Sequence, residues 1–379
     1  MRDVTVIGAG KIGAVVADFL SASGDYRVTV IDGSARALEQ LKTRAPVRVL
    51  ELDVGDGAAL TRALAGSFAV LSVAPFHLVR RVADAAKLAG AHYLDVTEDV
   101  AATRHVKALA REARIAFIPQ CGLAPGFIGM VAADLCRRFD EVHEVKMRVG
   151  ALPRYPSNAL NYNLTWSTDG LINEYCEPCE AIVDGERRTV APLEEREEFS
   201  LDGVAYEAFN TSGGLGTLCD VLDGKVRALN YKTIRYPGHA HIMKVLLNDL
   251  RLRDRRPVLK DILENALPGT LQDVVIALVT VAGVKAGRLL QETFVRKIYG
   301  QTINGFERSA IQVSTAAGLC GVLDLLAEGR LPQAGLVGQD QVPLEAFLHN
   351  RFGRYYAEAD LAAAEPRPAR RRSPERASA

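Results

Sequence analysis

Two kinds of apolar pattern alternate over the first part of the chain. Short continuous apolar runs, typical of buried strands, alternate with stretches whose apolar residues recur every three or four positions, as on one face of a helix. The strand-like runs cover 4–7, 27–31, 47–52, 69–73 and 92–96, and the helix-like stretches cover 11–23, 34–44, 57–64 and 77–88. This alternation predicts βαβ units, and therefore a Rossmann-type doubly wound α/β domain whose parallel sheet is covered on both faces.

The pattern changes after one more strand-like run at 114–120. The segment CGLAPG at 121–126 breaks the alternation and is followed by a predicted helix over 127–138. Strand-like alternation then appears without intervening helices over 144–149, 181–184, 198–201 and 226–234, and helical periodicity returns at 242–250 and 309–328. We therefore predict a first domain over 1–124 and a second, over 125–309, with an antiparallel or mixed sheet.

The end of the chain differs in composition from both predicted domains. Residues 365–379 contain three prolines and five arginines but no large apolar residue, which predicts a disordered tail over 364–379. The tail carries a net charge of +3, so the neutral total leaves −3 on the rest of the chain. A mildly acidic folded part argues against nucleic acid as a partner, because such proteins present basic surfaces.

Apolar-run lengths and cysteine content indicate the general class of protein. No run of eighteen uninterrupted apolar residues occurs, so we expect no membrane span. The six cysteines are sparse for 379 residues and predict reduced thiols in a cytoplasmic protein. Cys176 and Cys179 form one C-x-x-C pair, but a structural zinc site needs two more ligands, and we expect no metal.

A glycine-rich motif follows the first predicted strand. The residues Gly8-Ala9-Gly10-Lys11-Ile12-Gly13 fit G-x-G-x-x-G between a strand and an amphipathic helix, which is the context that a dinucleotide fingerprint requires. Its glycines permit the tight turn, the approach of backbone to a pyrophosphate and close helix–strand packing. Peptide N–H groups at the helix start then face the phosphates. The motif predicts a bound dinucleotide.

Three further positions are candidates for cofactor binding. Asp32 ends the second strand, where a carboxylate accepts hydrogen bonds from the ribose and repels a 2′-phosphate. It therefore favours NAD over NADP, although the nearby Arg36 weakens that preference and Asp32 also suits a helix cap. Asp53, after the third strand, is placed either at the adenine or in a plain turn. The loop Ser72-Val73-Ala74-Pro75 either lines the nicotinamide side or packs as an ordinary loop.

Seven segments carry a resemblance to a known family. They are VIGAGKIG (6–13), HYLDVTE (92–98), CGLAPG (121–126), STDGLINEYCEP (167–178), FNTSGGLGTL (209–218), LNYKTIRYPGH (229–239) and VPLEAFLHNRFGRYY (342–356). With them the chain resembles the saccharopine dehydrogenase family over roughly residues 1–360. The glycine motif is generic, whereas the TSGGLGTL and RYPGH stretches are specific.

The resemblance implies both an architecture and a reaction class. It implies that helices over 310–363 return to complete the first domain, that the inserted domain binds substrate, and that the protein is a homodimer. It also implies NAD(P)-dependent chemistry at an amine-bearing carbon of a small amino acid. Ala124 stands where saccharopine reductases carry an acidic residue, so the chain is more similar to members that oxidise the ε-amine of L-lysine to allysine. Saccharopine reductase, carboxynorspermidine dehydrogenase and a non-catalytic NAD sensor remain alternatives.

The second half supplies the candidates for substrate chemistry. Arg235 matches the family's carboxylate-binding arginine, and its planar fork suits a carboxylate. An ion pair within the protein is the alternative role for Arg235. His239 is the preferred base, because its ordinary pKa is near neutral, although a histidine in this turn also suits a structural role. Lys232 becomes a proton acceptor if burial lowers its pKa, but exposed strand lysines are more common.

The remaining candidates are polar residues near strand ends or glycines. Asp95 and Glu98 follow a strand of the first domain, where they hold a substrate ammonium or cap a helix. Asn163, Thr211 and Ser212 are candidate hydrogen-bond partners of the substrate. The glycines that follow, at 213–216, form either a second anion-binding loop or a turn between strands.

Overall fold

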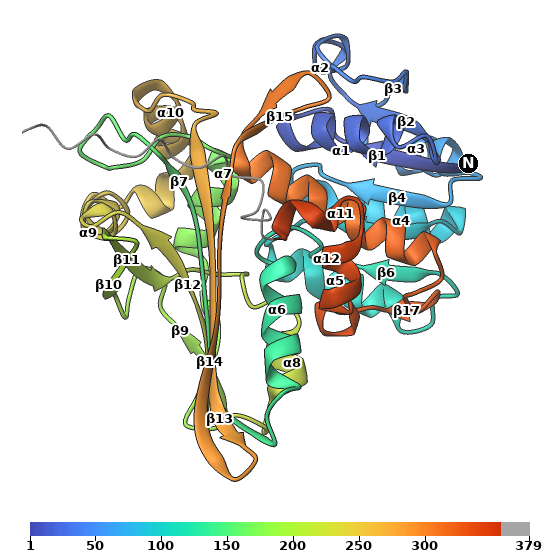
Figure 1. The fold of residues 1–379 in the computed structure, drawn as a ribbon. Helices are drawn as coiled ribbons and strands as arrows, with labels where there is room; N and C mark the ends of the chain where they lie inside the picture. Colours follow the sequence, from blue (N-terminus) through green and yellow to red (C-terminus); the bar gives the residue numbers. More distant parts are fainter. Residues whose placement is uncertain (358–379) are drawn as a thin grey trace, which may run out of the picture.

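The computed structural model describes residues 1–357 (Figure 1). The predicted tail over 364–379 and the last residues of the predicted 310–363 segment lie outside the described residues. The described chain forms two main sheets, one on each side of a long central helix.

The first sheet has seven strands in the order β17-β6-β5-β4-β1-β2-β3, and every pair is parallel. Its strands are β1 (Arg2–Ile7), β2 (Tyr26–Asp32), β3 (Arg48–Glu51), β4 (Ala69–Ser72), β5 (His92–Asp95), β6 (Ala116–Ile118) and β17 (Gly335–Leu336). The connecting helices are α1 (Lys11–Ala22), α2 (Ala35–Glu39), α3 (Gly57–Leu64), α4 (Val79–Ala89) and α5 (Val100–Ala110). The predicted doubly wound α/β class is confirmed.

Local hydrogen bonds explain where these helices depart from the predicted ranges. Helix α2 ends at Glu39 instead of Arg44, because the Arg44 N–H is drawn to the buried carboxylate of Asp18 at 2.8 Å. Helix α5 is absent from the periodicity-based prediction. It starts with an N-cap, in which the Asp99 side chain accepts a hydrogen bond from the Ala102 N–H. The short apolar spacing of 100–110 conceals this helix in the sequence.

The second sheet has eight strands and is mixed, as predicted. Its main path is β10-β11-β12-β7-β13-β14, and β12 and β7 form its parallel pair. The strands are β7 (Glu141–Pro153), β8 (Cys179–Val183), β9 (Glu186–Val190), β10 (Glu197–Leu201), β11 (Val204–Asn210), β12 (Ala228–Arg235), β13 (Asp273–Lys285) and β14 (Arg288–Tyr299). Its helices are α6 (Phe127–Cys136), α7 (Thr168–Cys176), α8 (Leu218–Leu222), α9 (His239–Lys244) and α10 (Arg256–Ala266).

The long β13–β14 hairpin was not predicted and extends far from the body of the protein (Figure 1). Its turn residues Ala286 and Gly287 both have positive φ, 50° and 71°, which is the geometry of a two-residue turn between right-twisted strands. The hairpin was missed because β13 reads as a continuous apolar run and lacks the usual Asn-Gly or Asp-Gly turn signal.

Helix α11 (Ala310–Ala327) returns from the second sheet to pack against α1 (Figure 1). Its mean hydropathy of 1.6 over eighteen residues would suit a membrane span by composition, but 89% of the helix is buried inside the protein. Ser309 and Gln312 form a capping box at its start, and the buried Asp273 of β13 accepts hydrogen bonds from Ala310 N and Ile311 N. The helix is thereby fixed to both sheets.

Asp324, near the end of α11, joins three segments that are distant in the sequence. Its carboxylate accepts hydrogen bonds from Tyr26 Oη of β2 at 2.6 Å and from Asn350 Nδ2 at 2.8 Å. Arg351 adds two more, from Nε at 3.0 Å and from Nη2 at 2.7 Å. These bonds, Arg351 foremost, hold the pKa of Asp324 below its ordinary value despite its burial.

We predict that Asp324→Asn lowers the free energy of unfolding by about 3 kcal/mol, because removing one partner leaves buried donors unpaired. Since the folded-state pKa of Asp324 is depressed, its stabilisation is present above the ordinary aspartate range and is lost as the pH falls through the folded value. Urea denaturation at neutral and acidic pH measures both effects.

Asp3→Asn is the matched control, since Asp3 pairs with Arg27 on an exposed surface and such pairs contribute about 0–1 kcal/mol. Equal losses in the two variants would contradict the structural role of Asp324.

Candidate active site

A cleft of about 1090 Å³ lies between the carboxyl ends of the first sheet and the second domain. One end is lined by the glycine turn after β1 and by Asp32, and the other by residues of β12 and α7, including Arg235 and Glu174. This is the edge of a parallel sheet at which ligands bind in open α/β folds.

The glycine turn has the geometry of a dinucleotide site. A Cβ atom at Gly13 would lie 1.8 Å from the Gly8 carbonyl oxygen, so the close packing of α1 on β1 requires glycine there. Gly10, in contrast, has no atom within 4 Å of its Cβ position, and it lines the cleft together with Lys11 and Ile12. The free space above Gly10 is where backbone approaches a pyrophosphate.

Two backbone hydrogen bonds orient the Asp32 carboxylate and leave some of its lone pairs free. Its Oδ2 accepts from the Ala9 N–H at 2.7 Å and its Oδ1 from the Ser34 N–H at 2.8 Å. Each carboxylate oxygen can accept further bonds, and the side chain lines the cleft. The Ala9 contact joins Asp32 to the glycine turn itself.

The loop predicted at the nicotinamide side lines the cleft, but Asp53 does not. Residues 72–75 all border the cleft, and Phe76 and His77 extend the wall. Asp53 is exposed and its Oδ1 accepts from the Gly55 N–H at 2.7 Å, which is the plain turn role. Its prediction as an adenine contact is therefore corrected: the first two strands, not the third, form this end of the cleft.

At the opposite end, Arg235 is the buried cation of the cleft. The residue is 2% exposed, and its guanidinium lies 5.1 Å from the ring centre of Tyr162. Its Nε donates to Tyr175 Oη at 2.9 Å and its Nη1 to the Ile234 carbonyl at 2.9 Å. Arg235 lines the cleft, so its remaining N–H groups are available there to a ligand. Their planar arrangement suits a carboxylate.

A chain of hydrogen bonds behind Arg235 defines the state of His239. His239 Nδ1 lies 2.9 Å from the Leu160 carbonyl, which only accepts, so Nδ1 carries the proton. Burial, with the nearby positive charge of Arg235, lowers the pKa of His239 to about 3, so the ring is neutral. Its Nε2 then accepts from Tyr175 Oη at 3.0 Å, and Tyr175 accepts in turn from Arg235.

His239 consequently lies behind the cleft instead of in it. It is completely buried and does not line the cleft, which corrects its prediction as the base that meets substrate. Glu207 fixes this turn, because its carboxylate accepts from the N–H groups of Gly238 and Ala240. His239 is a positioning residue that orients Tyr175 and, through it, Arg235.

Two carboxyl groups meet in the cleft near Arg235. Burial raises the pKa of Glu174 to about 8, with Arg235 opposing the shift and Glu98 adding to it. Burial also raises the pKa of Glu98 to about 7, and Asp99 and Asp95 add to the shift. Groups that titrate near neutral pH are suited to proton transfer. Glu98 was predicted at the site, whereas Glu174, inside the quoted 167–178 segment, was not singled out.

Two other predicted charged residues lie outside the cleft. Lys232 Nζ donates to the Glu195 carbonyl and to Glu197 Oε2, at 2.5 and 3.2 Å, on the far side of β12. Because side chains alternate along a strand, Lys232 points away from the face that presents Thr233 and Arg235. Asp95 is fully buried and accepts from the N–H groups of Thr97 and Gln120, so it shapes the loop instead of binding an ammonium.

The three predicted polar contacts are also placed away from the cleft. Asn163 accepts from Asn158 Nδ2 at 3.1 Å beneath the surface, and Ser212 donates its backbone N–H to the Glu174 carbonyl. Thr211 bonds to Thr233 through their hydroxyl groups at 2.7 Å and borders a second, smaller pocket. Of these neighbours, Thr233 is the one that lines the cleft itself.

Aromatic residues form the wall between the two ends of the cleft. Trp166, the single tryptophan of the chain, and Tyr231 both line it. A Cβ atom at Gly170 would lie 2.4 Å from the Trp166 ring and 3.2 Å from Glu98 Oε1, so these two groups meet over α7.

Metal chemistry has no evident centre in the described part of the chain. Among residues 1–357, no group of three or more His, Cys, Asp or Glu side chains gathers in a way that would hold an ion. All six cysteines are free, and five of them are buried. Cys176 and Cys179 therefore have no further ligands beside them.

Comparison with protein families gives two adjoining matches. A profile of the saccharopine dehydrogenase NADP binding domain matches residues 4–117, and one of the saccharopine dehydrogenase C-terminal domain matches residues 122–351. Together they include both the cofactor end and the substrate end of the cleft.

The similar proteins are distant and longer. Mitochondrial alpha-aminoadipic semialdehyde synthase of Bos taurus is 23% identical over 322 residues, 79% of this chain and 34% of that protein. Saccharopine dehydrogenase (NADP(+), L-glutamate-forming) of Saccharomyces cerevisiae is 24% identical over 275 residues, 67% of this chain. The chain spans 59% of the length of the yeast protein.

Two solved structures share the fold. The apo saccharopine dehydrogenase (L-Glu forming) of Saccharomyces cerevisiae has a TM-score of 0.74 at 17% identity, with 92% of this chain and 96% of that chain covered. Homospermidine synthase of Legionella pneumophila, in complex with NAD, has a TM-score of 0.62 at 13% identity, with 94% and 89% covered.

We predict that Glu174→Gln removes a pH dependence of stability. Because the folded-state pKa of Glu174 is raised, the folded protein holds a proton that the unfolded chain releases between the ordinary glutamate range and about pH 8. The free energy of unfolding that this group contributes is therefore lost as the pH rises. The glutamine variant loses less stability over the same rise in pH. Urea denaturation at mildly acidic and mildly alkaline pH measures the difference.

Glu264→Gln is the control, since Glu264 borders the same cleft but is exposed. A Glu174→Gln curve parallel to wild type over this pH range would show that Glu174 is not a buried neutral carboxyl group.

Proposed function

Since the chain belongs to the saccharopine dehydrogenase family, we propose that it is an NAD-dependent oxidoreductase that oxidises an amine-bearing carbon of an amino acid. We propose L-lysine, oxidised at its ε-carbon, as the substrate. The observation that carries the proposal is the charge pattern of the cleft: one buried cation, Arg235, and two carboxyl groups, Glu174 and Glu98, opposite the dinucleotide end.

This pattern matches an amino acid with one carboxylate and two amines. Arg235 offers free N–H groups to the α-carboxylate, and each carboxyl group is available to one amine. A saccharopine-type substrate carries additional carboxylates, which Glu98 and Glu174 repel in their ionised forms. Lys260 also borders the cleft but is paired with Asp169 at 2.6 Å, and Ala124 offers no charge at the corresponding wall.

The reaction requires removal of a proton before oxidation. The ordinary pKa of a lysine amine is about 10.4, so the ε-ammonium is protonated at neutral pH. Glu98 or Glu174 in its ionised form takes that proton, and the free lone pair then assists loss of hydride from the ε-carbon. Bound NAD supplies the acceptor for this hydride.

The same carboxyl groups serve the second half of the reaction. Water adds to the imine carbon while one carboxylate takes its proton, and a protonated carboxyl group returns a proton to the departing nitrogen. The products are ammonia and the aldehyde allysine, which closes on its own α-amine with loss of water. His239 contributes by keeping Tyr175 and Arg235 in place.

Asp32 supports NAD as the cofactor, although the matching family profile is named for NADP. Its carboxylate lines the cleft beside the glycine turn. A ribose bound there would find an acceptor for its hydroxyls, whereas a 2′-phosphate would meet a like charge. We predict that Asp32→Asn lowers the ratio of kcat/KM with NAD to that with NADP by about tenfold, because this repulsion is lost.

The measurement is initial rate at 340 nm with each dinucleotide. Asp53→Asn makes the same change at the end of the neighbouring strand, outside the cleft, and is expected to leave the ratio unchanged. An unchanged ratio in Asp32→Asn would remove Asp32 from the ribose site.

Formation of NADH from L-lysine, compared with L-ornithine and saccharopine, tests the substrate. Because Arg235 binds the carboxylate, we predict that Arg235→Gln raises KM for lysine roughly 30- to 100-fold. The variant should also lose discrimination between lysine and 1,5-diaminopentane, which lacks that carboxylate.

The diamine separates a binding role from misfolding, since a misfolded variant would lose both activities alike. Turnover of saccharopine but not lysine would favour the saccharopine reductase alternative. No NADH formation with any of the three substrates would refute the dehydrogenase assignment.

A further inference from the structure

The two carboxyl groups of the cleft approach it from different points along helix α7. At Gly170, in the first turn of α7, a Cβ atom would lie 3.2 Å from Glu98 Oε1 and 2.4 Å from the Trp166 ring. Glu174 lies four residues further along, and residues with this spacing share one helix face with Cβ atoms about 5–6 Å apart. Gly170 and Glu174 both line the cleft, so Glu98 meets the beginning of this face and Glu174 extends from its next turn.

Arg235 lies beside the part of α7 that carries Glu174. Tyr175, the residue after Glu174, accepts a hydrogen bond from Arg235 Nε on its hydroxyl oxygen at 2.9 Å. The charge of Arg235 opposes the effect of burial on the pKa of Glu174, whereas the charges that act on the pKa of Glu98 are acidic neighbours near it in sequence. Arg235 and Glu174 are therefore neighbours in the cleft.

The protein itself leaves the Glu174 carboxyl group without a partner. The residue is 7% exposed, and within residues 1–357 no hydrogen bond or ion pair engages its carboxyl oxygens. No cation of the same residues forms an ion pair with Glu98. A buried carboxyl group without a partner is costly unless a ligand supplies the donor, so both positions are available to a bound amine.

The loop 211–216 fixes these two residues relative to each other. The Ser212 N–H donates to the Glu174 carbonyl oxygen at 3.1 Å, and a Cβ atom at the adjacent Gly213 would lie 2.2 Å from the Glu98 carbonyl oxygen. One short loop thus contacts the backbone of both residues, although Glu98 belongs to the first domain and Glu174 to the second. Packing this close leaves little room for their spacing to change.

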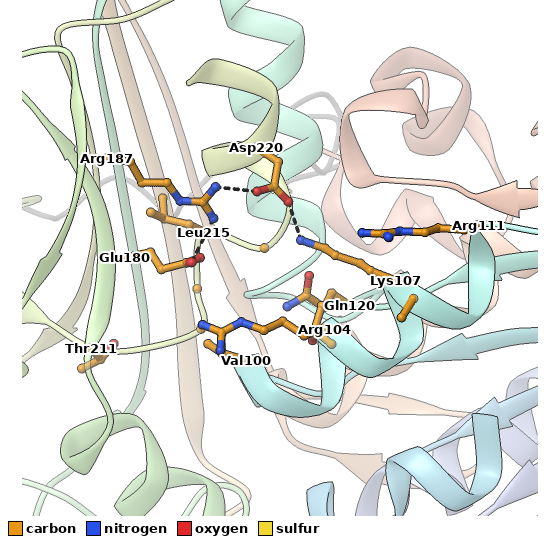
Figure 2. A pocket seen from close by; sticks show the side chains of 15 residues that line it. Val100, Arg104, Lys107, Arg111, Gln120, Glu180, Arg187, Thr211, Leu215 and Asp220 are labelled. Carbon is orange, nitrogen blue, oxygen red and sulfur yellow. Dashed lines mark hydrogen bonds and ion pairs between the residues drawn. The ribbon is translucent and has the colours of Figure 1, made fainter. Parts of the chain in front are cut away.

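Ion pairs on the other side of this loop support the same contact. Figure 2 shows Lys107 of α5 at 2.6 Å from Asp220 of α8, and Arg187 at 2.7 Å from Asp220 and 2.9 Å from Glu180. Helix α5 begins two residues after Glu98. These pairs therefore link the helix that follows Glu98 to the second domain.

Glu98 lies on the side of the cleft that the first sheet forms. It follows β5, and Asp95 of β5 pairs with Ser72, where the predicted nicotinamide loop 72–75 begins. That loop and Glu98 both line the cleft, whereas Arg235 belongs to the second domain. Because hydride passes directly from the substrate carbon to the nicotinamide, the reacting carbon has to lie at the Glu98 end.

We propose that Glu98 and Trp166 receive the ε-amine of the substrate and that Glu98 takes its proton, whereas Glu174 binds the α-ammonium beside Arg235. This assignment rests on the proposed function and decides which carboxyl group acts on which amine. The α-amine and the carboxylate share one carbon atom, so they need neighbouring partners, and Glu174 and Arg235 are such neighbours. The ε-amine is then left for Glu98, at the end where oxidation takes place.

The proton transfer to Glu98 changes no bond to carbon. An N–H bond of the ε-ammonium breaks, an O–H bond forms on the Glu98 carboxylate, and the nitrogen keeps the electron pair. This pair forms the C=N bond when hydride leaves the ε-carbon for NAD. An aromatic ring such as Trp166 beside the carboxylate also attracts an alkylammonium group. Glu98 is thus a catalytic residue, and Glu174 determines specificity for α-amino acids.

Two analogues of lysine test the assignment by binding alone. Norleucine has the α-ammonium and the carboxylate but no ε-amine, and 6-aminohexanoate has the ε-amine and the carboxylate but no α-amine. Each is titrated calorimetrically into the full-length protein at saturating NADH. We expect Glu98→Gln to weaken binding of 6-aminohexanoate about tenfold or more, because one charge-assisted bond is lost, and to leave norleucine within about twofold. Glu174→Gln is expected to do the opposite.

Glu264→Gln is the matched control, since it removes the same charge from an exposed position at the same cleft and should leave both affinities unchanged. A variant that binds one analogue normally is folded, so its loss of the other analogue reports the site. Exchanged effects, equal weakening of both analogues, or no saturable binding of either analogue to the wild type would overturn the assignment.

Turnover of L-lysine separates this assignment from the proposed function. We expect Glu98→Gln to lower kcat about 100-fold or more, and Glu174→Gln to raise KM with a far smaller effect on kcat. An unchanged kcat in Glu98→Gln would refute its role as proton acceptor. The selective binding pattern without NADH formation by the wild type would refute the proposed reaction and leave the two amine sites standing. NADH formation with the binding pattern exchanged would do the reverse.

Discussion

The close approach of the loop 211–216 to two cleft residues is the constraint on which the rest of the site depends. Gly213 has φ of +84°, and neither it nor Gly214 has space for a side chain against Glu98 and Tyr231. The second domain can therefore touch the end of β5 directly. Glu98, which follows β5, thereby shares one cavity with Glu174 and Arg235 of the second domain.

Burial of these charges explains both the chemistry and the rigidity of the substrate end. Desolvation moves the pKa of Glu98 and Glu174 upward into the neutral range, whereas it moves that of His239 far downward. The neutral histidine then accepts the Tyr175 proton, and Tyr175 accepts from Arg235. A guanidinium that is held from behind in this way keeps its free N–H groups aimed at the cleft, so less conformational entropy is lost when a carboxylate binds.

Local chemistry explains which parts of the site were predictable from the sequence. The glycine turn and Asp32 depend on a strand, a turn and a helix that are adjacent in the chain, so spacing alone locates them. The substrate end is formed by residues of α7 and β12 and by those that follow β5. Which residues line it depends on which face of each element points into the cleft. Lys232 and Arg235 lie in one strand three positions apart and therefore face opposite sides, which the quoted segment does not reveal. Glu174 was missed for the same reason, because the quoted 167–178 segment does not reveal which face of α7 lines the cleft.

The order of the elements explains how two domains maintain so specific a cleft. The chain leaves the first domain at 121–126 and returns through α11, so two connections, not one, cross between the sheets. Asp273 at the start of β13 caps the returning helix, and Asp324 ties its far end to β2 and to the last described residues. Because both ends of α11 are held by buried carboxylates that bond to different sheets, the returning helix links the two walls of the cleft.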